Sequence, residues 1–220
     1  MKLSEYLPVW DKLTGEEQKE LNGCVRTQTV PAGLHIYSSA QECLGLLILT
    51  GGQLRVYILS EEGREVTLYR LLQGDICLFS ASCVFHSVQF DLAVVAEKET
   101  TLYLIPFDKY KALMERSIVV SNFTNEIMAT RMSEVMWLIK QIMWQSFDKR
   151  LAAFLLEEKG LNHTDVLRIT HEQIAGHLGT AREVVSRMLK YFQQEGWVTI
   201  ARGNVTITDD KALSALAGHS

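Results

Sequence analysis

The feature that most constrains the fold is a change of pattern near Ser117. From Ser117 to Gln145 the chain contains neither glycine nor proline, which predicts one long helix over this stretch. Before it, from Thr29 to about Phe107, short β-rich runs alternate with glycines, as in LGLLILTGGQLRVYIL. Many short strands followed by a long helix predict an α+β fold whose sheets form a sandwich or barrel.

Local alternation of residue types supports this interpretation. Polar and apolar residues alternate over 53–58 and again over 65–69, which predicts two half-buried strands. Glu62 and Gly63 between them are typical of a hairpin turn.

Composition limits the class of protein. With 220 residues, of which 47% are hydrophobic and 22% charged, the chain can bury a sizeable core as one large domain or two modest ones. Its first residues carry charge throughout, and no apolar run approaches the roughly 18 residues that cross a bilayer. We therefore expect a soluble cytoplasmic protein with no membrane partner. Cys24, Cys43, Cys77 and Cys83 form no C-x-x-C pair, which is typical of reduced thiols rather than of a disulfide framework or a zinc ribbon.

The net charge of −4 is not that of a protein that binds nucleic acid non-specifically. The acidity, however, lies in residues 1–146, which hold 13 Lys and Arg against 17 Asp and Glu, whereas residues 147–220 hold 9 against 9. A neutral C-terminal region can still bind DNA if its basic side chains share one face.

The long helix carries an apolar stripe wider than a coiled-coil seam. Its seam residues are Met128, Val135, Leu138 and Ile142, interrupted by Arg131, and beside them lie Met132, Met136, Ile139 and Met143. The residues predicted to form the dimer helix are Met128, Met132, Val135, Leu138 and Ile142. Such a helix either packs on its own sheet or pairs with the helix of a second copy, and both interpretations can hold together. After it, the run KRLAAFLLEEKG predicts a shorter helix that ends at Gly160, so we place a hinge near Ser146.

Residues 168–197 contain two short helices joined by a tight turn. Thr170 is a good N-cap, and Gln173 completes a capping box for a first helix through Leu178. Gly179 makes the turn, and a second helix begins near Ala181. The second helix buries an apolar face, predicted as Val184, Val185, Met188, Leu189 and Phe192. This is the pattern of a helix-turn-helix, whose second helix enters the major groove of DNA.

The other interpretation of this segment is an ordinary helical hairpin with a solvated polar face. The following stretch VTIARGNVTIT favours the DNA-binding interpretation, because it predicts a compact β-hairpin around Arg202 and Gly203, as a winged helix-turn-helix carries beside its recognition helix. The residues predicted to bind DNA are Thr170, His171, Thr180, Arg182, Glu183, Ser186, Arg187, Lys190 and Arg202. An arginine there can bind guanine O6 and N7, and a glutamate can accept from cytosine N4.

With these motifs in place, the chain resembles the CRP/FNR family of bacterial regulators over nearly its whole length. The strongest match is ITHEQIAGHLGTAREVVSRMLKYFQQEG, where the family's pattern R-E-x-x-[GS]-R falls on Arg182, Glu183, Ser186 and Arg187. Serine rather than glycine resembles the FNR branch, which implies a two-fold TTGAT-like site. The resemblance implies a cyclic-nucleotide-binding-type β-roll sensor over 1–116, a dimerisation helix over 117–146 and a winged helix-turn-helix over 147–220.

The family resemblance also bears on the ligand of the β-roll. In cyclic-AMP-responsive members a Glu and an Arg-Ser pair bind the nucleotide, but here those positions fall at Phe79 or Ser80 and at Phe90 and Asp91. Because no Lys or Arg lies between Asp75 and Lys98, a cyclic phosphate would lack a cation. An iron–sulfur cluster of the FNR type needs four thiolates, and the N-terminal region offers only Cys24.

A pocket can nevertheless be predicted in the β-roll. Its candidate residues are Cys77, Phe79, Ser80, Cys83, His86, Phe90 and Asp91. They are either ordinary core, or Cys83 and His86 ligate a metal or haem, or a thiol senses oxidation. A Cys–His hydrolase is disfavoured because no orienting third residue is evident.

The resulting expectation is a homodimeric transcription regulator, not an enzyme, that binds palindromic double-stranded DNA and is gated by a small molecule or a redox signal. The alternative is a constitutive repressor or architectural DNA-binding protein whose sensor has no effector. RNA polymerase is a further candidate partner. No catalytic or metal-ligating residue is predicted, the cofactor is unknown, and the sequence names neither the effector nor the target genes.

Overall fold

The computed structural model describes residues 2–38, 45–77 and 92–218. By its internal contacts the chain divides into two compact units. The first comprises residues 1–58 and 68–136, and the second comprises residues 59–67 and 137–220. In the described residues, none of the helices has the length and hydrophobicity that a membrane crossing requires.

Two four-stranded sheets form the body of the first unit. One has the order β1 (Arg26–Val30), β8 (Thr100–Pro106), β3 (Gly45–Gly51), β6 (Ile76–Cys77), and the other β2 (His35–Ser38), β7 (Leu92–Ala96), β4 (Leu54–Leu59), β5 (Glu65–Leu71). The strands predicted over 53–58 and 65–69 are present as β4 and β5, and the predicted α+β fold is confirmed. Two short helical turns, η1 (Leu3–Glu5) and η2 (Trp10–Lys12), precede helix α1 (Gly15–Cys24).

Strand β3 shows how the sequence builds two cores from one sheet. Its side chains alternate between the two faces, as the pleat of a strand requires. Leu47 and Leu49 pack into a core shared by both sheets, whereas Leu46 and Ile48 pack into a second core with α1, α3 (Phe107–Arg116) and the start of α4 (Ile118–Trp144). The continuous apolar run of this segment therefore reflects burial on both faces.

Strand β4 departs from the expectation of a half-buried strand. Leu54 and Val56 are buried, but Arg55 and Tyr57 of the opposite face are buried as well. The Arg55 guanidinium lies 4.3 Å from the centre of the Tyr57 ring, and the Tyr57 hydroxyl is 2.9 Å from His35 Nε2. The prediction of a half-buried strand was wrong, because the polar groups of Arg55 and Tyr57 find partners within the domain and can therefore be buried. The alternation of residue types does not reveal such partners.

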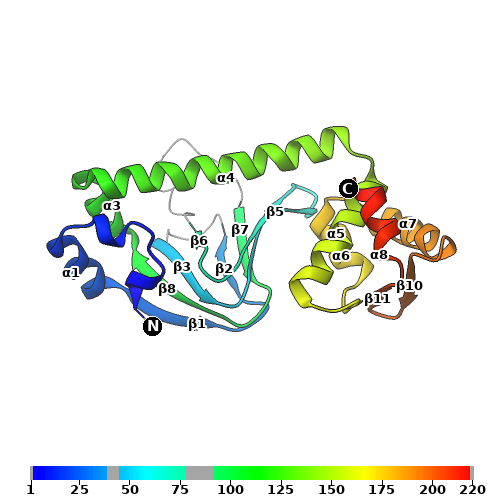
Figure 1. The fold of residues 1–220 in the computed structure, drawn as a ribbon, viewed down its shortest axis with the longest axis horizontal. Coiled ribbons are helices and arrows are strands. Elements are labelled where there is room, and N and C mark those ends of the chain that lie inside the picture. Colours follow the sequence, from blue (N-terminus) through cyan, green and yellow to red (C-terminus); the bar gives the residue numbers. More distant parts are fainter. Residues whose placement is uncertain (1, 39–44, 78–91, 219–220) are drawn as a thin grey trace. The chain divides into compact units, whose positions relative to one another are not determined.

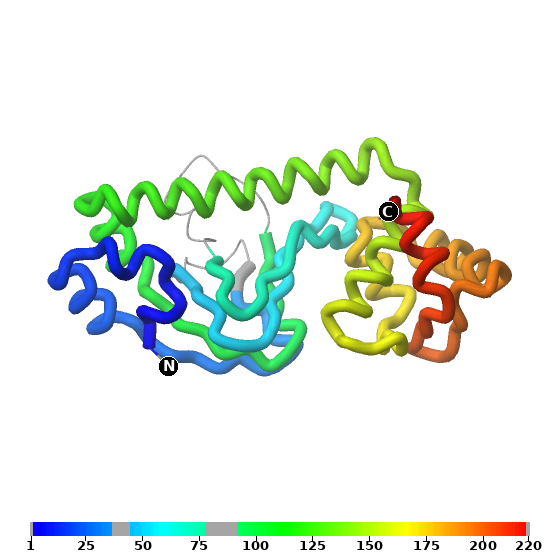
Figure 2. Tube along the Cα trace, viewed as in Figure 1, coloured from blue at the N-terminus to red at the C-terminus, as the bar shows by residue number. Residues whose placement is uncertain are grey.

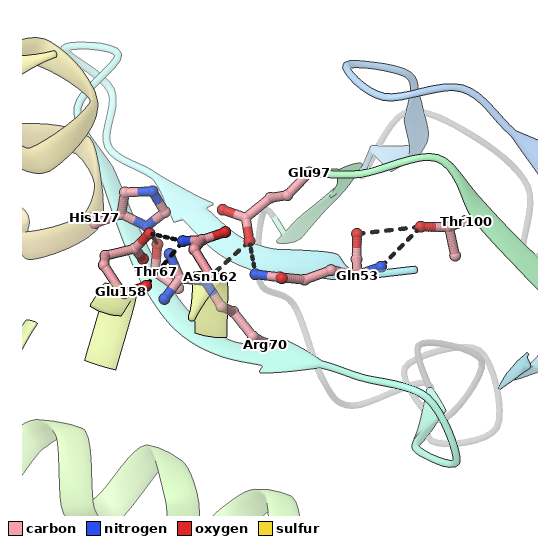
Figure 3. Close-up of polar contacts among 8 residues, drawn as sticks. All are labelled: Gln53, Thr67, Arg70, Glu97, Thr100, Glu158, Asn162 and His177. Atoms are coloured by element: carbon pink, nitrogen blue, oxygen red, sulfur yellow. Dashed lines mark hydrogen bonds and ion pairs between the residues drawn. The ribbon is translucent and has the colours of Figure 1, made fainter. Parts of the chain in front are cut away.

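A polar network connects residues at the ends of strands from both sheets (Figure 3). Glu97 Oε2 accepts from Gln53 Nε2 at 2.6 Å and from Arg70 Nε at 2.9 Å. The Gln53 backbone N–H donates to the Thr100 hydroxyl at 3.0 Å, and that hydroxyl is 3.2 Å from the Gln53 carbonyl oxygen. Gln53 and Thr100 are buried, so these bonds compensate groups that would otherwise be costly to desolvate.

Helix α4 runs without interruption from Ile118 to Trp144, which confirms the predicted long helix (Figure 1). Its beginning packs through Val120 and Phe123 into the core beside α1 and α3. No element was predicted before Thr29, yet Thr14 and Glu17 form a reciprocal capping box that starts α1. The capping pattern was therefore present in the sequence but was not used.

The second unit, in its described part, has helices packed around a small three-stranded sheet. Its elements are α5 (Phe147–Asn162), β9 (Val166–Leu167), α6 (His171–Leu178), α7 (Arg182–Gln194), β10 (Val198–Ala201), β11 (Asn204–Ile207) and α8 (Asp210–Ala217), with strand order β10-β11-β9. The last helix, α8, red in Figure 2, packs against α5. Leu155, Ile174, Leu189 and Phe192 are fully buried where α5, α6 and α7 meet.

Helix α5 does not end at Gly160 as predicted. It continues to Asn162, whose side-chain amide donates to the Glu158 carbonyl oxygen at 2.9 Å (Figure 3). His163 takes the left-handed conformation that ends the helix, with φ of 52°. The prediction was wrong because Asn162 and His163 supply the helix end, so Gly160 remains an interior residue.

Candidate nucleic-acid interface

Helix α6 is fixed at both ends by its own sequence. The Thr170 hydroxyl accepts from the Gln173 backbone N–H at 3.2 Å, and the Gln173 side-chain oxygen accepts from the Thr170 N–H at 2.8 Å. At the other end Gly179 has φ of 65°, a conformation that favours glycine. The predicted cap, helix and turn are therefore confirmed.

Helix α7 begins at Arg182, shortly after this turn, and is strongly amphipathic. Val185, Leu189 and Phe192 are completely buried in the domain core, whereas Val184 and Met188, predicted as buried, are only half-buried. The opposite face lines one surface depression with Arg182, Glu183, Ser186, Arg187, Lys190, Tyr191 and Gln194. Burial of one side thus forces the polar side chains of the recognition pattern to the surface.

The charged side chains of this face are exposed, as a DNA-binding surface requires. Arg182, Arg187 and Lys190 supply three cations, and Glu183 supplies one anion in the first turn of α7, where the helix dipole favours it. With Ser186, the structure therefore brings together five of the predicted DNA-binding residues on a single helix face.

Ser186 and His171 form a pair between the two helices. The Ser186 hydroxyl oxygen lies 2.8 Å from His171 Nδ1, and both side chains are half-buried. Loss of hydration and, to a smaller extent, the positive charge of Arg182 hold the pKa of His171 below its ordinary value. His171 is therefore neutral near pH 7.

The remaining predicted DNA-binding residues flank this face. Thr180 lies in the turn between the helices, and its backbone N–H donates to the Ala175 carbonyl oxygen at 3.0 Å. Arg202 is exposed in the turn between β10 and β11, where Gly203 has φ of 75°. The predicted wing is thus present as a β-hairpin.

One residue that positions this surface was missed. Arg150 of α5 donates from Nη1 to the Leu178 carbonyl oxygen at 3.3 Å, at the C-terminal end of α6. A cation at this end compensates the helix dipole, although burial lowers the pKa of Arg150. No local signal marks this role, because the two residues belong to different helices.

The candidate effector pocket is described only at Cys77. This thiol is buried in the core shared by the two sheets, as an ordinary core cysteine would be. Phe79, Ser80, Cys83, His86, Phe90 and Asp91 lie outside the described residues.

The predicted dimer helix presents a different stripe from the predicted seam. Arg131 faces the sheet, since its guanidinium donates to the Ile76 carbonyl oxygen at 3.2 Å. Val135 and Leu138 are half-buried, and Met128 packs on the core beside α1. The exposed stripe consists of Met132, Met136, Ile139 and Met143, spaced four, three and four residues apart, while Ile142 is 44% exposed.

Comparison with known proteins identifies this arrangement. Residues 27–117 match the model of the cyclic nucleotide-binding domain, and residues 149–216 match that of the Crp-like helix-turn-helix domain. A solved structure of a protein assigned to the Crp/Fnr family of transcriptional regulators, from Eubacterium rectale, is 52% identical with a TM-score of 0.95. The match covers 97% of this chain and 99% of that one. The chain belongs to the CRP/FNR family of transcription regulators.

More distant relatives of this CRP/FNR regulator carry different names. The fumarate and nitrate reduction regulatory protein of Salmonella typhimurium is 26% identical over 220 residues, which covers 94% of the chain and 85% of the relative. The cyclic AMP receptor protein of Thermus thermophilus is 25% identical over 210 residues, which covers 96% of each. The two identities are nearly equal, so the FNR-like branch stays a prediction. The CRP/FNR relatives are regulators, and the chain is a DNA-binding regulator rather than an enzyme.

Proposed function

We propose that this regulator binds a two-fold symmetric DNA site as a homodimer in the cytoplasm, with α7 of each copy in the major groove. The observation that carries the proposal is the exposed face of α7, where Arg182, Arg187 and Lys190 stand opposite a fully buried apolar face. A helix held in this way can lie in the groove without loss of its own packing.

The roles of the individual side chains follow from their chemistry. Arg187, at the middle of the exposed face, suits a bidentate bond to guanine O6 and N7, and Glu183 suits the amino group of cytosine. Lys190 and Arg202, nearer the edges, suit phosphate groups, which fix orientation without reading sequence. Thr170 and Thr180 at the ends of α6 suit the same purpose.

The homodimer is proposed to form through α4. Met132, Met136, Ile139 and Met143 are between 40% and 66% exposed, although they are large apolar side chains. A repeat of four and three residues brings such side chains to one line along a helix, which is the geometry of a two-helix seam. A dimer would also supply the second recognition helix that a palindromic site needs.

Gating by a small molecule or a redox signal in the β-roll is the regulatory part of the proposal. The effector would act by binding the DNA-competent state more tightly than the other state. RNA polymerase remains a candidate partner. The competing function is a constitutive repressor or architectural protein, for which DNA affinity would not respond to any metabolite or oxidant.

Selection from random double-stranded DNA tests the core of this proposal. We expect the parent to enrich a palindrome, and Arg187→Ala to weaken binding to that site by about 1–3 kcal/mol per half-site through loss of one bidentate base contact. Lys211→Ala removes an exposed cation from α8 and serves as the matched control, with little change expected. Equal affinities of the parent and Arg187→Ala for the selected site would overturn the assignment.

A further inference from the structure

Ser186 is the one member of the recognition pattern whose side chain is held by another part of the protein. Its hydroxyl oxygen lies 2.8 Å from Nδ1 of His171, the first residue of α6, whereas the neighbouring Arg187 is exposed. The pair joins the two helices of the helix-turn-helix at the surface that is proposed to face DNA.

A serine hydroxyl by itself discriminates poorly between bases, because it can donate its proton or accept one. The bond to His171 removes this freedom when the Ser186 hydroxyl is its donor. When the hydroxyl donates to an unprotonated Nδ1, only the lone pairs of the oxygen remain for a base. The oxygen can then accept from the amino group of adenine N6 or cytosine N4, but it cannot donate to thymine O4 or guanine O6.

The surroundings of His171 favour this direction of the bond. An imidazolium could only donate from Nδ1, but a positive charge at the N-terminus of α6 is opposed by the helix dipole. Arg182 of α7 adds to that opposition, consistent with the lowered pKa of His171. In the neutral tautomer that carries its proton on Nε2, Nδ1 is the acceptor, and the serine proton satisfies it.

We infer that His171 is a specificity-determining positioning residue, which orients the Ser186 hydroxyl so that it selects a base carrying an amino group, adenine or cytosine, at one position of each half-site. This inference rests on the proposed function, because it assumes that α7 reads base edges. His171 then affects base preference by orienting Ser186, and not by contacting a DNA phosphate itself.

The test measures base preference with the full-length protein and the site selected by the parent. Selection with Ser186→Ala first identifies the position whose preference depends on the hydroxyl. His171→Phe keeps the ring but removes both nitrogens, whereas His171→Asn keeps an acceptor near the place of Nδ1. Affinities for the four base variants at that position are then compared by fluorescence anisotropy, together with thermal unfolding of each variant.

We expect adenine or cytosine at that position in the parent, and a loss of about fivefold in preference per half-site in His171→Phe, as for one uncharged hydrogen bond. The base preference at other positions of the site should remain unchanged. His171→Asn should retain part of the preference at the tested position. The double variant of His171→Phe with Ser186→Ala should lose no more of this preference than Ser186→Ala alone. If His171→Phe does not fold, His171→Leu, which also lacks an acceptor, and its double variant with Ser186→Ala carry the same comparison.

The inference is overturned if His171→Phe weakens all sequences equally and its effect adds fully to that of Ser186→Ala, since that is the behaviour of a phosphate contact. Selection of thymine or guanine by the parent would also overturn it. Failure of the proposed function looks different: the parent would then select no sequence at all, and Arg187→Ala would change nothing.

Discussion

The guanidinium of Arg131 lies over the ring of Tyr69, 4.8 Å from the ring centre. The same guanidinium donates to both carboxylate oxygens of Glu134, at 2.9 and 2.8 Å, and to the Ile76 carbonyl oxygen. Burial raises the pKa of Tyr69 well above its usual range, so the ring stays neutral. Arg131 therefore connects α4 to strand β5 by one stacking contact and to strand β6 by one hydrogen bond, and its two bonds to Glu134 of the same helix hold the guanidinium in place.

Arg131→Met should reduce the free energy of unfolding by about 1–3 kcal/mol, because the stem still packs but the stacking contact and the bond to Ile76 are lost. Urea unfolding of the full chain measures this change. Arg64→Met is the matched control, since Arg64 pairs with Glu62 at a site where both side chains are largely exposed, at 64% and 73%. Such surface pairs contribute about 0–1 kcal/mol. Equal losses in the two variants would contradict the structural role of Arg131.

The proposed dimer seam predicts a change in oligomeric state. Met132→Glu combined with Met136→Glu should raise the dimer dissociation constant roughly a hundredfold or more, because each chain would bury two unpaired carboxylates. Both side chains are at least half exposed in the single chain, so the fold should survive. Analytical ultracentrifugation measures the change, and Thr130→Glu, on the other side of the helix, is the control. A parent that sediments as a monomer at micromolar concentration would contradict the seam.

The lowered pKa of His171 predicts a dependence of stability on pH. The folded chain disfavours the charged imidazole, so the unfolded chain binds more protons below the ordinary histidine pKa of about 6.5. The resulting loss of folding stability is absent well above pH 6.5 and grows as the pH falls through this value. Between pH 7.5 and 5.5 the parent should therefore lose more thermal stability than His171→Asn. Because the other five histidines are common to both proteins, equal losses would show that the pKa of His171 is not lowered.

Cyclic nucleotides should not bind to the β-roll, although residues 27–117 match a cyclic nucleotide-binding domain. The chain has no Lys or Arg between Asp75 and Lys98, and Arg131, which reaches the sheet from α4, is already paired with Glu134. A cyclic phosphate would then lack a cation. Isothermal titration calorimetry with cyclic AMP should give no heat of binding, with the Thermus thermophilus cyclic AMP receptor protein as the positive control. A micromolar dissociation constant would contradict the prediction.

We predict that oxidation does not act on DNA affinity through Cys77 in the folded state. Its thiol is only 1% exposed, so an oxidant has little access. DNA affinity should be the same in the parent and in Cys77→Ser after mild oxidation. A response that Cys77→Ser abolishes would show that the β-roll opens enough to expose this thiol.

The sequence by itself determined the features that depend on neighbouring residues. The capping box of Thr170 and Gln173, the left-handed turn at Gly179 and the apolar face of α7 are all local, because helix ends and helix faces are set within three or four residues. The same holds for the absence of glycine and proline that predicts α4. These features were enough to predict the order of the domains and the DNA-binding helix.

Only the tertiary structure decided which groups meet across elements. Three features depend on segments that are distant in sequence. They are the burial of Tyr57, the bond from Arg150 to the end of α6 and the pairing of His171 with Ser186. The same is true of Arg131, which turns one side of α4 toward the sheet and leaves Met132 and its neighbours exposed. The physical reason is that periodicity gives the faces of a helix or strand, but burial depends on what packs against each face.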